Sequence, residues 1–358
     1  MLSYRYLLFR SPVISIIFVG DDVVSFENLS EIEQQARSRI ILPLDNLNTY
    51  GAALGRITAL AGYTGMFKIG KGSHTRLNNY DLVNAVKNSG ANFFLDLKYK
   101  DIPNTVEDAS KAATEHGAKM FNVHADGGYD MMVASMNGID QAIEENPDLT
   151  VPKGLAVTVL TSLGLPAYLF TQGDLLQGEL REYDFISHID LTKRAKELKV
   201  ASKKNPMALP EFTKVSLELK ERDNVLYNMV LESGYVPSDT PIEKVGEVLI
   251  GQAVAHRTRM AIAAGMDGIV CSAADLKYFN EIGFELPKDF VTVTPGIKHP
   301  SAAGFVGTDQ ARVMIPSVAI EEGADYLVIG RAITGGKTPE ERQHRAYEVI
   351  EDIARVIV

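Results

Sequence analysis

Apolar runs and amphipathic stretches alternate along most of the chain. Eight short apolar runs, most of them bounded by Gly, Asp or Asn, have the length of buried strands. They are Ile40–Leu44, Gly65–Gly70, Asn92–Leu97, Lys119–His124, Gly154–Leu160, Gly268–Ser272, Phe290–Thr294 and Asp325–Gly330. Helical stretches such as Tyr80–Ser89 and Asn104–His116 lie between them. Eight strands, each followed by a helix, predict an α/β protein with a closed parallel (β/α)8 barrel, the TIM barrel.

An open, doubly wound parallel sheet is the alternative architecture for the same alternation. Its dinucleotide-binding form carries a G-x-G-x-x-G turn directly after the first strand. No such turn follows Ile40–Leu44. The closed barrel is therefore the favoured fold.

Residues 1–38 precede the predicted barrel as an N-terminal extension. Ser30 with Glu33 forms a capping-box pattern, which predicts a short helix over Ser30–Ser38. The most apolar part of the extension is Ser11–Gly20, a candidate secretion signal. Because no small-residue cleavage site follows it, we favour a peripheral strand or a loose extension.

The interval between the fifth and sixth predicted strands is much longer than one crossover helix requires. Apolar residues recur at helical spacing in Asp190–Lys203 and Glu211–Ser233. We therefore predict a mostly helical insertion at about 165–239 in the fifth strand-to-helix loop, with Ile242–Ala264 as the crossover helix. Without the extension and the insertion, the barrel of 39–358 has about the 250 residues that are typical of this fold.

Charge and cysteine content narrow the function classes. The chain has 36 basic and 46 acidic residues, a net charge of −10, which disfavours a nucleic-acid partner. No apolar run reaches the roughly twenty residues of a membrane span, so we expect no membrane partner. The single cysteine, Cys271, excludes an internal disulfide framework and a multi-cysteine zinc site. It fits a reducing cytoplasm, the predicted location.

The most informative motif is the run Asp96–Thr105, which reads DLKYKDIPNT. Asp96 and Lys98 are two residues apart on a predicted strand, so their side chains share one face. The carboxyl end of a barrel strand opens onto the active-site mouth, and Asp101 follows in the next loop. Two carboxylates beside one ammonium form an arrangement that shifts proton affinities or destabilises a bound anion. An ordinary ion pair at the barrel rim is the alternative interpretation.

A phosphate site is predicted where the last two strands end. Thr292–Lys298 leaves the seventh strand, and Leu327–Arg331 leaves the eighth and enters a short helix. The loops after these two strands form the usual phosphate site of the fold. Arg331 offers a fork-shaped cation, and Gly330 lets backbone amides approach phosphate oxygens.

Further segments accompany these motifs in the same order along the chain. They are Leu44-Asp45, Phe67–Gly70, Asn122–Gly128, Val157–Ser162, Asp267–Ser272, Thr294–Ile297 and Asp309-Gln310. Together with Asp96–Thr105 and Gly330-Arg331, they make the sequence resemble the orotidine 5′-phosphate decarboxylases. The resemblance runs from about Arg39 to the C-terminus, apart from the predicted insertion. It implies conversion of orotidine 5′-phosphate to uridine 5′-monophosphate and CO2, the final step of de novo synthesis of that nucleotide.

The resemblance also implies residue roles. Lys98 would be the general acid that gives a proton to C6 of the pyrimidine, and Asp96 would lie against the departing carboxylate. Asp101 would reach into the neighbouring subunit's site, which makes a homodimer with shared active sites the catalytic unit. Lys68 would bond to Asp96 and to the ribose, and Asp45 to a ribose hydroxyl.

The remaining implied roles concern substrate binding. The implied residues at the ribose, the pyrimidine and the phosphate are Thr105, Thr161, Ser162, Pro295, Lys298, Gln310, Gly330 and Arg331. Neither a metal nor an organic cofactor is implied. Lys298 stands where the bacterial family usually has arginine, which keeps the charge and loses the bidentate fork. Tyr99-Lys100 likewise replaces the usual Phe-His.

Two other functions stay open at this point. A magnesium-dependent relative on the same barrel, of the keto-gulonate phosphate decarboxylase or hexulose phosphate synthase type, shares Asp-x-Lys-x-x-Asp. It lacks the Ile-Pro-Asn-Thr continuation that is present here. A non-catalytic phosphate-binding scaffold is the second alternative, although a scaffold has no physical need for Lys98 between two carboxylates.

Overall fold

The computed structural model describes residues 16–19, 22–25, 29–77, 79–160, 163, 165–172, 180, 183–301 and 314–357. The chain divides into two compact units. The first unit consists of Met1–Val157, Ala261–Ala273 and Pro287–Val358. The second unit consists of Thr158–Met260 and Ala274–Leu286.

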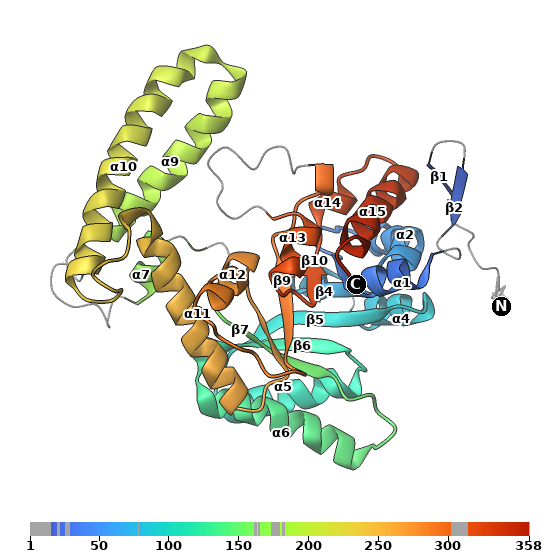
Figure 1. Cartoon of the computed structure of the whole chain (residues 1–358). Coiled ribbons are helices and arrows are strands. Elements are labelled where there is room, and N and C mark those ends of the chain that lie inside the picture. The colour runs from blue at the N-terminus through green and yellow to red at the C-terminus, as the bar shows by residue number, and fades with distance from the viewer. Residues whose placement is uncertain are drawn as a thin grey trace, which may run out of the picture. The chain divides into compact units, whose positions relative to one another are not determined.

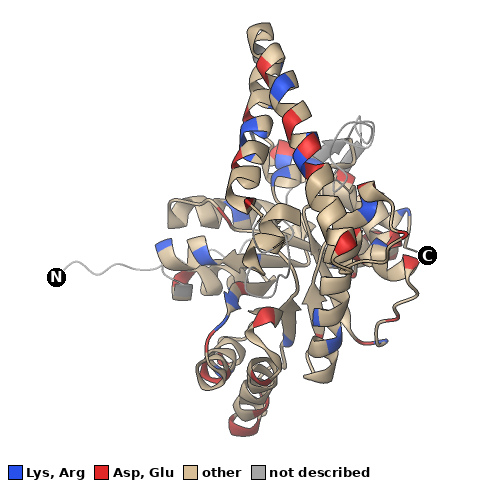
Figure 2. Cartoon of the chain, turned by 90° about the vertical axis from the view of Figure 1, so that its left-hand side faces the viewer, with Lys and Arg blue, Asp and Glu red and all other residues tan. Residues whose placement is uncertain are grey.

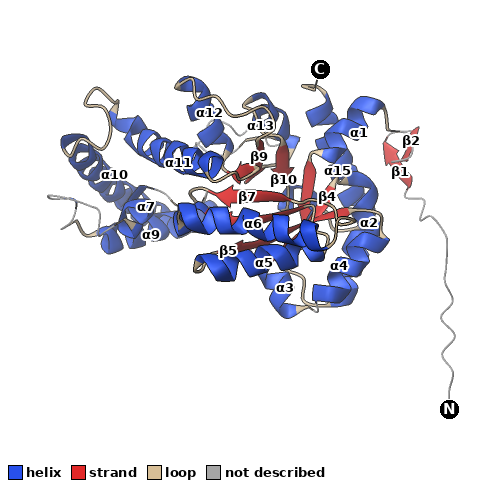
Figure 3. Cartoon of the chain, turned by 90° about the horizontal axis from the view of Figure 1, so that it is seen from below, coloured by secondary structure: helices blue, strands red, loops and turns tan. Residues whose placement is uncertain are grey.

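Eight parallel strands close a barrel in the first unit. Figures 1 and 3 show strands of this barrel with helices around them. The neighbours around the barrel are β10-β3-β4-β5-β6-β7-β8-β9, so that each strand pairs with the next strand along the chain and the last pairs with the first. The strands are β3 (Ile40–Pro43), β4 (Met66–Gly70), β5 (Asn92–Tyr99), β6 (Met120–His124), β7 (Lys153–Val157), β8 (Gly268–Val270), β9 (Val291–Pro295) and β10 (Tyr326–Val328). The predicted (β/α)8 barrel is confirmed.

Six of the eight strands end one to three residues away from the predicted end, among them β7 and β5. The fifth strand of the barrel, β7, ends at Val157 and not at Leu160, because its ladder with β8 stops at the pair Val157 and Val270. The central strand β5 runs two residues beyond Leu97, to Tyr99. It does so through a register shift against β6 that lies between Leu95 and Tyr99.

Two short elements precede the barrel. β1 (Ile16–Val19) pairs antiparallel with β2 (Asp22–Ser25). Helix α1 (Glu31–Ser38) begins after Ser30, whose hydroxyl accepts a hydrogen bond from the amide of Glu33. The Glu33 carboxylate in turn accepts from the amide of Ser30 at 2.8 Å, so the predicted capping box is confirmed.

The helices of the first unit lie outside the strands (Figure 3). Besides α1, they are α2 (Tyr50–Leu60), α3 (Lys71–Arg76), α4 (Asn79–Asn88), α5 (Pro103–Glu115), α6 (Tyr129–Glu145), α13 (Pro316–Glu321), α14 (Arg331–Thr334) and α15 (Pro339–Ala354). The α5 and α6 helices pack closely at Gly138, where an added Cβ would lie 2.2 Å from the carbonyl oxygen of Glu107. The Ser110 and Ser135 hydroxyls bond across the same interface at 2.9 Å.

An apolar cluster fills the barrel interior. Its fully or almost fully buried members come one each from six strands: Ile41, Met66, Phe94, Met120, Leu155 and Val293. Because alternate residues of a strand face the same side, the residues two positions further along also point inward. On β4, β5 and β6 these are Lys68, Asp96 and Asn122. The barrel therefore changes from an apolar to a polar interior towards the carboxyl ends of its strands.

The second unit is mostly helical. Its helices are α7 (Leu165–Thr171), α9 (Phe185–Lys204), α10 (Leu209–Glu232), the first part of α11 (Val245–Ala263) and most of α12 (Ala273–Glu281), with short 3-10 turns at Pro206–Ala208 and Ile242–Lys244. The three helices predicted from Asp190–Lys203, Glu211–Ser233 and Ile242–Ala264 correspond to α9, α10 and α11. None of the described helices combines the length and the apolar character that a membrane crossing needs.

Helices α9 and α10 form a long hairpin (Figure 1). Polar contacts of the buried His188 join them: His188 on α9 contacts the half-buried Asp223 on α10 through its Nε2 at 3.0 Å. The other ring nitrogen of His188 lies 2.8 Å from the Tyr183 hydroxyl. Basic and acidic residues are interspersed over the rest of the hairpin, as Figure 2 shows.

Candidate active site

A row of four alternating charges occupies the carboxyl end of the barrel. Its centre is Asp96, which has only 9% of its side chain exposed. One oxygen of Asp96 lies 2.8 Å from Nζ of Lys68. The other accepts hydrogen bonds from Nζ of Lys98 and, at 2.7 Å, from the side-chain amide of Asn122. Asp96 is therefore held by two ammonium groups and one amide.

Lys68 extends the row to a second carboxylate. Its Nζ also donates to Asp45 at 3.0 Å, and Asp45 follows the end of β3 with 43% of its side chain exposed. Gly70 keeps space for this pair, since an added Cβ would stand 2.7 Å from Oδ1 of Asp45 and 3.2 Å from Nζ of Lys68. The charges thus alternate from Asp45 through Lys68 and Asp96 to Lys98.

The neighbours of the two buried charges fix their protonation. Burial favours the neutral form of Lys68, but the carboxylates of Asp96 and Asp45 outweigh burial and raise the pKa of Lys68. Burial also favours the neutral form of Asp96, but Lys68 and Lys98 outweigh it and lower the pKa of Asp96. Both groups are charged at neutral pH, so Lys98 lies next to a permanent negative charge.

Lys98 has an unusual backbone for a lysine. Its φ of +51° lies in the left-handed region, and it falls within the register shift of β5 against β6. The Asn122 side chain accepts a hydrogen bond from the Lys98 amide at 2.8 Å while it donates to Asp96. A bulge of this kind redirects side chains at a strand end. Here it accompanies an ammonium that is 27% exposed at the barrel mouth.

Asn122 was not predicted as a functional residue. Its signal in the sequence is a lone amide in the apolar strand β6, which reads MFNVH. The amide alone does not reveal its role, because its partners lie on β5 and are separated from it by 24 and 26 positions.

Two of the predicted site residues lie outside the row of charges that their own chain forms. Asp101 and Thr105 are both exposed, and between them Ile102 is 66% exposed, a high value for an isoleucine. Asp101 accepts a hydrogen bond from the amide of Ile102 at 2.7 Å. Among the described residues it makes no ion pair with Lys68 or Lys98.

The predicted phosphate residues lie on the last two strand ends. Pro295 is the final residue of β9, and Lys298 is exposed three residues later, with its amide bonded to the carbonyl of Met314 at 3.0 Å. Gly330 precedes α14, and Arg331 is the exposed first residue of that helix. Gln310, Thr161 and Ser162 lie outside the described residues.

A comparison with known sequences shows the family to which this barrel belongs. The sequence model of the orotidine 5′-phosphate decarboxylase / HUMPS family matches residues 38–170 and 221–346, which is most of the chain. The chain belongs to this family. The match leaves 171–220 uncovered, a stretch that includes all of α9 and the first half of α10.

Named relatives agree with the family assignment. The chain is 30% identical over 323 residues to the orotidine 5′-phosphate decarboxylase of Syntrophus aciditrophicus, covering 90% of this chain and 95% of that protein. It is also 30% identical over 307 residues to the enzyme of the same name from Geotalea daltonii, covering 86% and 93%. The crystal structure of orotidine 5′-phosphate decarboxylase from Lactobacillus acidophilus matches with a TM-score of 0.51 and 23% identity, over 88% of this chain and 98% of that chain. This last likeness supports the fold.

Other candidate sites are weaker. His124 at the end of β6 lies 3.7 Å from Asp126, and Asp126 pairs with Lys100 at 3.0 Å, so the replaced position Lys100 is directed to a carboxylate. Among the described residues no group of three His, Cys, Asp or Glu side chains is placed to hold a metal ion. Cys271 is fully buried, as expected for a packing residue.

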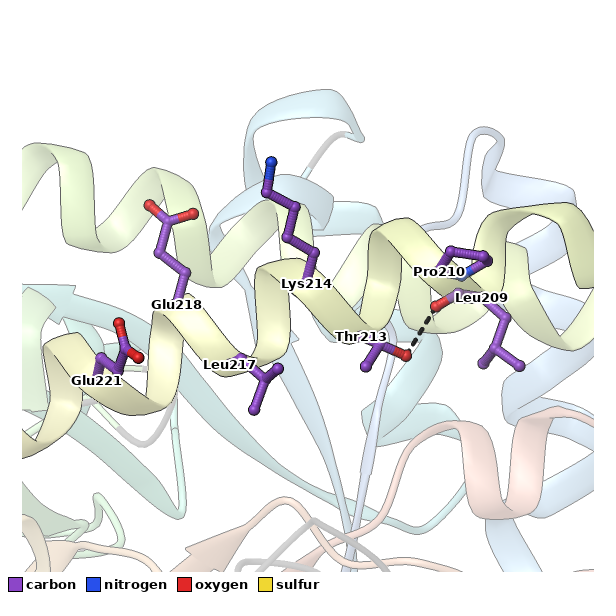
Figure 4. A pocket seen from close by; sticks show the side chains of 7 residues that line it. All are labelled: Leu209, Pro210, Thr213, Lys214, Leu217, Glu218 and Glu221. Atoms are coloured by element: carbon purple, nitrogen blue, oxygen red, sulfur yellow. Dashed lines mark hydrogen bonds between the residues drawn. The ribbon is translucent and has the colours of Figure 1, made fainter.

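A groove of about 700 Å³ lies along α10 in the second unit (Figure 4). It is lined by Leu209, Pro210, Thr213, Lys214, Leu217, Glu218 and Glu221. All seven belong to one helix, and the Thr213 hydroxyl bonds back to the Leu209 carbonyl at 2.9 Å. This is an open helix face without the converging charges of the barrel mouth.

Proposed function

We propose that the protein decarboxylates orotidine 5′-phosphate to uridine 5′-monophosphate and CO2, the last step of de novo synthesis of that nucleotide, without a metal or an organic cofactor. The observation that carries the proposal is the row of Asp45, Lys68, Asp96 and Lys98, which ends in a partly exposed ammonium at the barrel mouth. The names of the relatives support the same substrate.

The proposed reaction breaks the bond between C6 of the pyrimidine and its carboxylate. The electron pair of that bond stays on C6, CO2 leaves, and the ammonium of Lys98 delivers one proton to C6. The ring offers this carbanion little delocalisation, so it needs a positive charge held in place beforehand. Asp96 and Asn122 supply that placement, since they hold the Lys98 ammonium and its backbone amide.

Asp96 has a second proposed role. It is buried and its pKa is lowered, so it stays ionised next to the place where the substrate carboxylate would lie. Two carboxylates in close contact repel each other, which favours the loss of one of them as CO2. This contribution is a form of ground-state destabilisation.

Substrate binding is assigned by family resemblance. Asp45, Lys68 and Thr105 would hold the ribose, and Thr161 and Ser162 would lie at the pyrimidine. The phosphate end would be bound by Pro295, Lys298, Gln310, Gly330 and Arg331. The exposed positions of Lys298 and Arg331 on the last two strand-to-helix loops support this assignment.

The catalytic unit is proposed to be a homodimer. Asp101, Ile102 and Thr105 are exposed within one chain, and Asp101 makes no ion pair with the lysines of its own site. A partner subunit that covers Ile102 would also receive the Asp101 carboxylate. We place the enzyme in the cytoplasm, for which the single cysteine gives support.

The barrel of 39–358 is proposed to carry an insertion at about 165–239 and an extension at 1–38. The gap in the family match at 171–220 supports the insertion. The compact grouping of Thr158–Met260 apart from the barrel supports it as well.

The test is turnover of orotidine 5′-phosphate by the purified chain, followed by the loss of orotate-ring absorbance with and without a chelator. We expect equal rates in both conditions. Activity that disappears in chelator and returns with magnesium would favour the sugar-phosphate relatives of the same barrel. Absence of turnover in both conditions, with a folded protein, would favour a non-catalytic scaffold.

A further inference from the structure

Two segments of the chain, one around Ile297 and one around Met314, meet beside the predicted phosphate site. Ile297 forms a parallel bridge with Met314, and the Lys298 amide donates to the Met314 carbonyl at 3.0 Å. Gly296 allows the turn that brings Ile297 there, with φ of +87°. Lys298 therefore lies where two chain segments are joined by backbone contacts.

One of these two segments is attached to helix α15 by a histidine. Nε2 of His299, next to Lys298, lies 3.1 Å from the Glu348 carboxylate. Nδ1 of His299 accepts from the Ser301 amide at 3.3 Å and lies 2.8 Å from the Ser301 hydroxyl. Since Nδ1 accepts from an amide, Nε2 carries the proton; it lies beside the Glu348 carboxylate but makes no hydrogen bond with it. Burial lowers the pKa of His299 and outweighs the Glu348 carboxylate, which raises it, so the pKa lies below its ordinary value and the neutral form is favoured.

The other segment is attached to the same helix four residues further on. The amide of Ser317, in the first turn of α13, donates to the Asp352 carboxylate at 2.8 Å. Asp352 is a buried carboxylate with 5% exposure. A buried carboxylate requires a hydrogen-bond donor, and the Ser317 amide is the donor for Asp352.

A third contact of α15 reaches the other phosphate loop. The Arg345 guanidinium donates to the carbonyl oxygen of Ala332 at 3.0 Å, and Ala332 follows Arg331 in α14. Arg345, Glu348 and Asp352 are spaced three and four residues apart, which places them on one face of α15. One helix face thus contacts the chain beside both Lys298 and Arg331.

We propose that Arg345, Glu348 and Asp352 are positioning residues that set the distance between the two phosphate-binding cations, Lys298 and Arg331. The inference rests on the proposed function of these two cations. Lys298 follows β9 and Arg331 begins α14, and a dianionic phosphate gains from both cations only when their separation is fixed in advance. The polar face of α15 provides that fixed separation through two hydrogen bonds and the contact between His299 and Glu348.

The first experiment separates positioning from general stability. Glu348→Ala and Asp352→Ala are compared with wild type on orotidine 5′-phosphate and on orotidine, which lacks the phosphate. Loss of one of these carboxylate contacts predicts a rise in KM for the phosphate ester of about tenfold. We expect kcat/KM for orotidine to stay within a factor of about two, because that substrate does not use the two cations.

Two matched variants sharpen the result. Glu351→Ala removes a carboxylate from the same helix that makes none of the three contacts, and it should leave both substrates unaffected. Glu348→Gln keeps a side-chain oxygen beside Nε2 of His299, so most of the affinity should return. Equal losses for both substrates in Glu348→Ala would indicate a merely structural role and overturn the proposal, as would an unchanged KM for the phosphate ester.

A binding measurement separates this proposal from the proposed function. Calorimetric titration with inorganic phosphate should give about tenfold weaker binding in Glu348→Ala and Asp352→Ala than in wild type and Glu351→Ala. This result would stand even if wild type failed to decarboxylate orotidine 5′-phosphate, in which case the proposed function alone would be wrong. Equal phosphate affinity in all four proteins would overturn the positioning role.

Discussion

Lys98 combines a partly exposed ammonium at the barrel mouth with a backbone conformation that lysine adopts at a cost. Among the described residues, the non-glycine residues with positive φ are Asn46 and Lys98. The left-handed conformation costs roughly 1–2 kcal/mol for a residue with a Cβ. The Asn122 contact to the Lys98 amide offsets part of that cost. Strain of this kind at the barrel mouth is typical of a residue whose position matters for activity.

This strain predicts a difference between two inactive variants. Lys98→Gly removes the side chain and the strain, while Lys98→Ala removes the side chain and keeps a Cβ at positive φ. We expect Lys98→Gly to be the more stable of the two by about 1 kcal/mol in urea unfolding. A more stable alanine variant would show that the left-handed backbone at this position is absent in solution.

The contribution of Asn122 to the placement of Lys98 can be measured through enzyme activity. Its amide joins the Lys98 backbone to the Asp96 carboxylate, so Asn122→Ala should leave Lys98 present and poorly aimed. We expect kcat to fall by about 10- to 100-fold with little change in KM, since misplacement of a catalytic group acts on the chemical step. An unchanged kcat in Asn122→Ala would show that Asn122 does not position Lys98 for the chemical step.

The buried charge of Asp96 predicts a pH dependence of stability. Its pKa is lowered in the folded protein, so its contribution is present above the unfolded pKa of about 3.9 and is lost as the pH falls further. Asp96→Asn should therefore be less stable than wild type by about 3 kcal/mol at pH 7, the lower end of the range for breaking a buried pair. The difference in free energy of unfolding between the two proteins should become smaller below about pH 4.

Thermal or urea unfolding of both proteins between pH 3 and pH 8 checks this. The raised pKa of Lys68 stabilises the fold below the unfolded lysine pKa of about 10.4 and does not contribute a slope in this window. If wild type and Asp96→Asn differed in free energy of unfolding by the same amount at pH 3 and at pH 7, the negative charge of Asp96 would not be the source of the stabilisation.

At the residue scale, the sequence could predict part of the site. The period of two in a strand places Asp96 and Lys98 on one face, and they do contact each other. The left-handed backbone of Lys98 could not be predicted, because it depends on Asn122 of a neighbouring strand. The pairing of Lys68 with Asp96 was implied by the family resemblance, whereas its contact with Asp45 was not predicted. Both contacts need the closed barrel, since the three residues come from three different strand ends.

At the scale of elements, local sequence signals were most informative where they depend on near neighbours. The Ser30 and Glu33 capping box predicts the start of α1, and apolar runs predict all eight barrel strands. Strand ends were less predictable: residues up to Leu160 are as apolar as a strand, but β7 ends at Val157 with its ladder to β8. A ladder depends on the partner strand, which a single segment does not specify.

The α5–α6 contact offers a matched pair of glycine substitutions. Gly138→Ala would place a Cβ 2.2 Å from the Glu107 carbonyl, so one helix must move, and we expect a loss of about 1–3 kcal/mol. Gly51→Ala in α2 meets nothing within 4 Å and should be neutral or stabilising by up to about 1 kcal/mol. Urea unfolding of the two variants measures both effects. Equal stabilities would contradict the close helix packing at Gly138.

At the scale of the whole molecule, the proposed shared site predicts complementation between inactive subunits. Lys98→Ala and Asp101→Ala proteins are each expected to be nearly inactive. Random exchange in a two-fold dimer makes half of the dimers mixed, and each mixed dimer has one site with both residues intact. An equimolar mixture should therefore recover about a quarter of the wild-type specific activity. Without recovery, despite subunit exchange shown by differently tagged chains, Asp101 would act within its own subunit.

The central claim is that the Lys98 ammonium protonates C6 as CO2 departs. The most direct measurement is the single-turnover rate of orotidine 5′-phosphate decarboxylation by wild type and by Lys98→Ala, at saturating enzyme and with chelator present. Removal of a general acid alone predicts a loss of at least about 10²- to 10⁴-fold, while uridine 5′-monophosphate should still bind to the folded variant. A Lys98→Ala protein that decarboxylates at the wild-type rate would contradict the account.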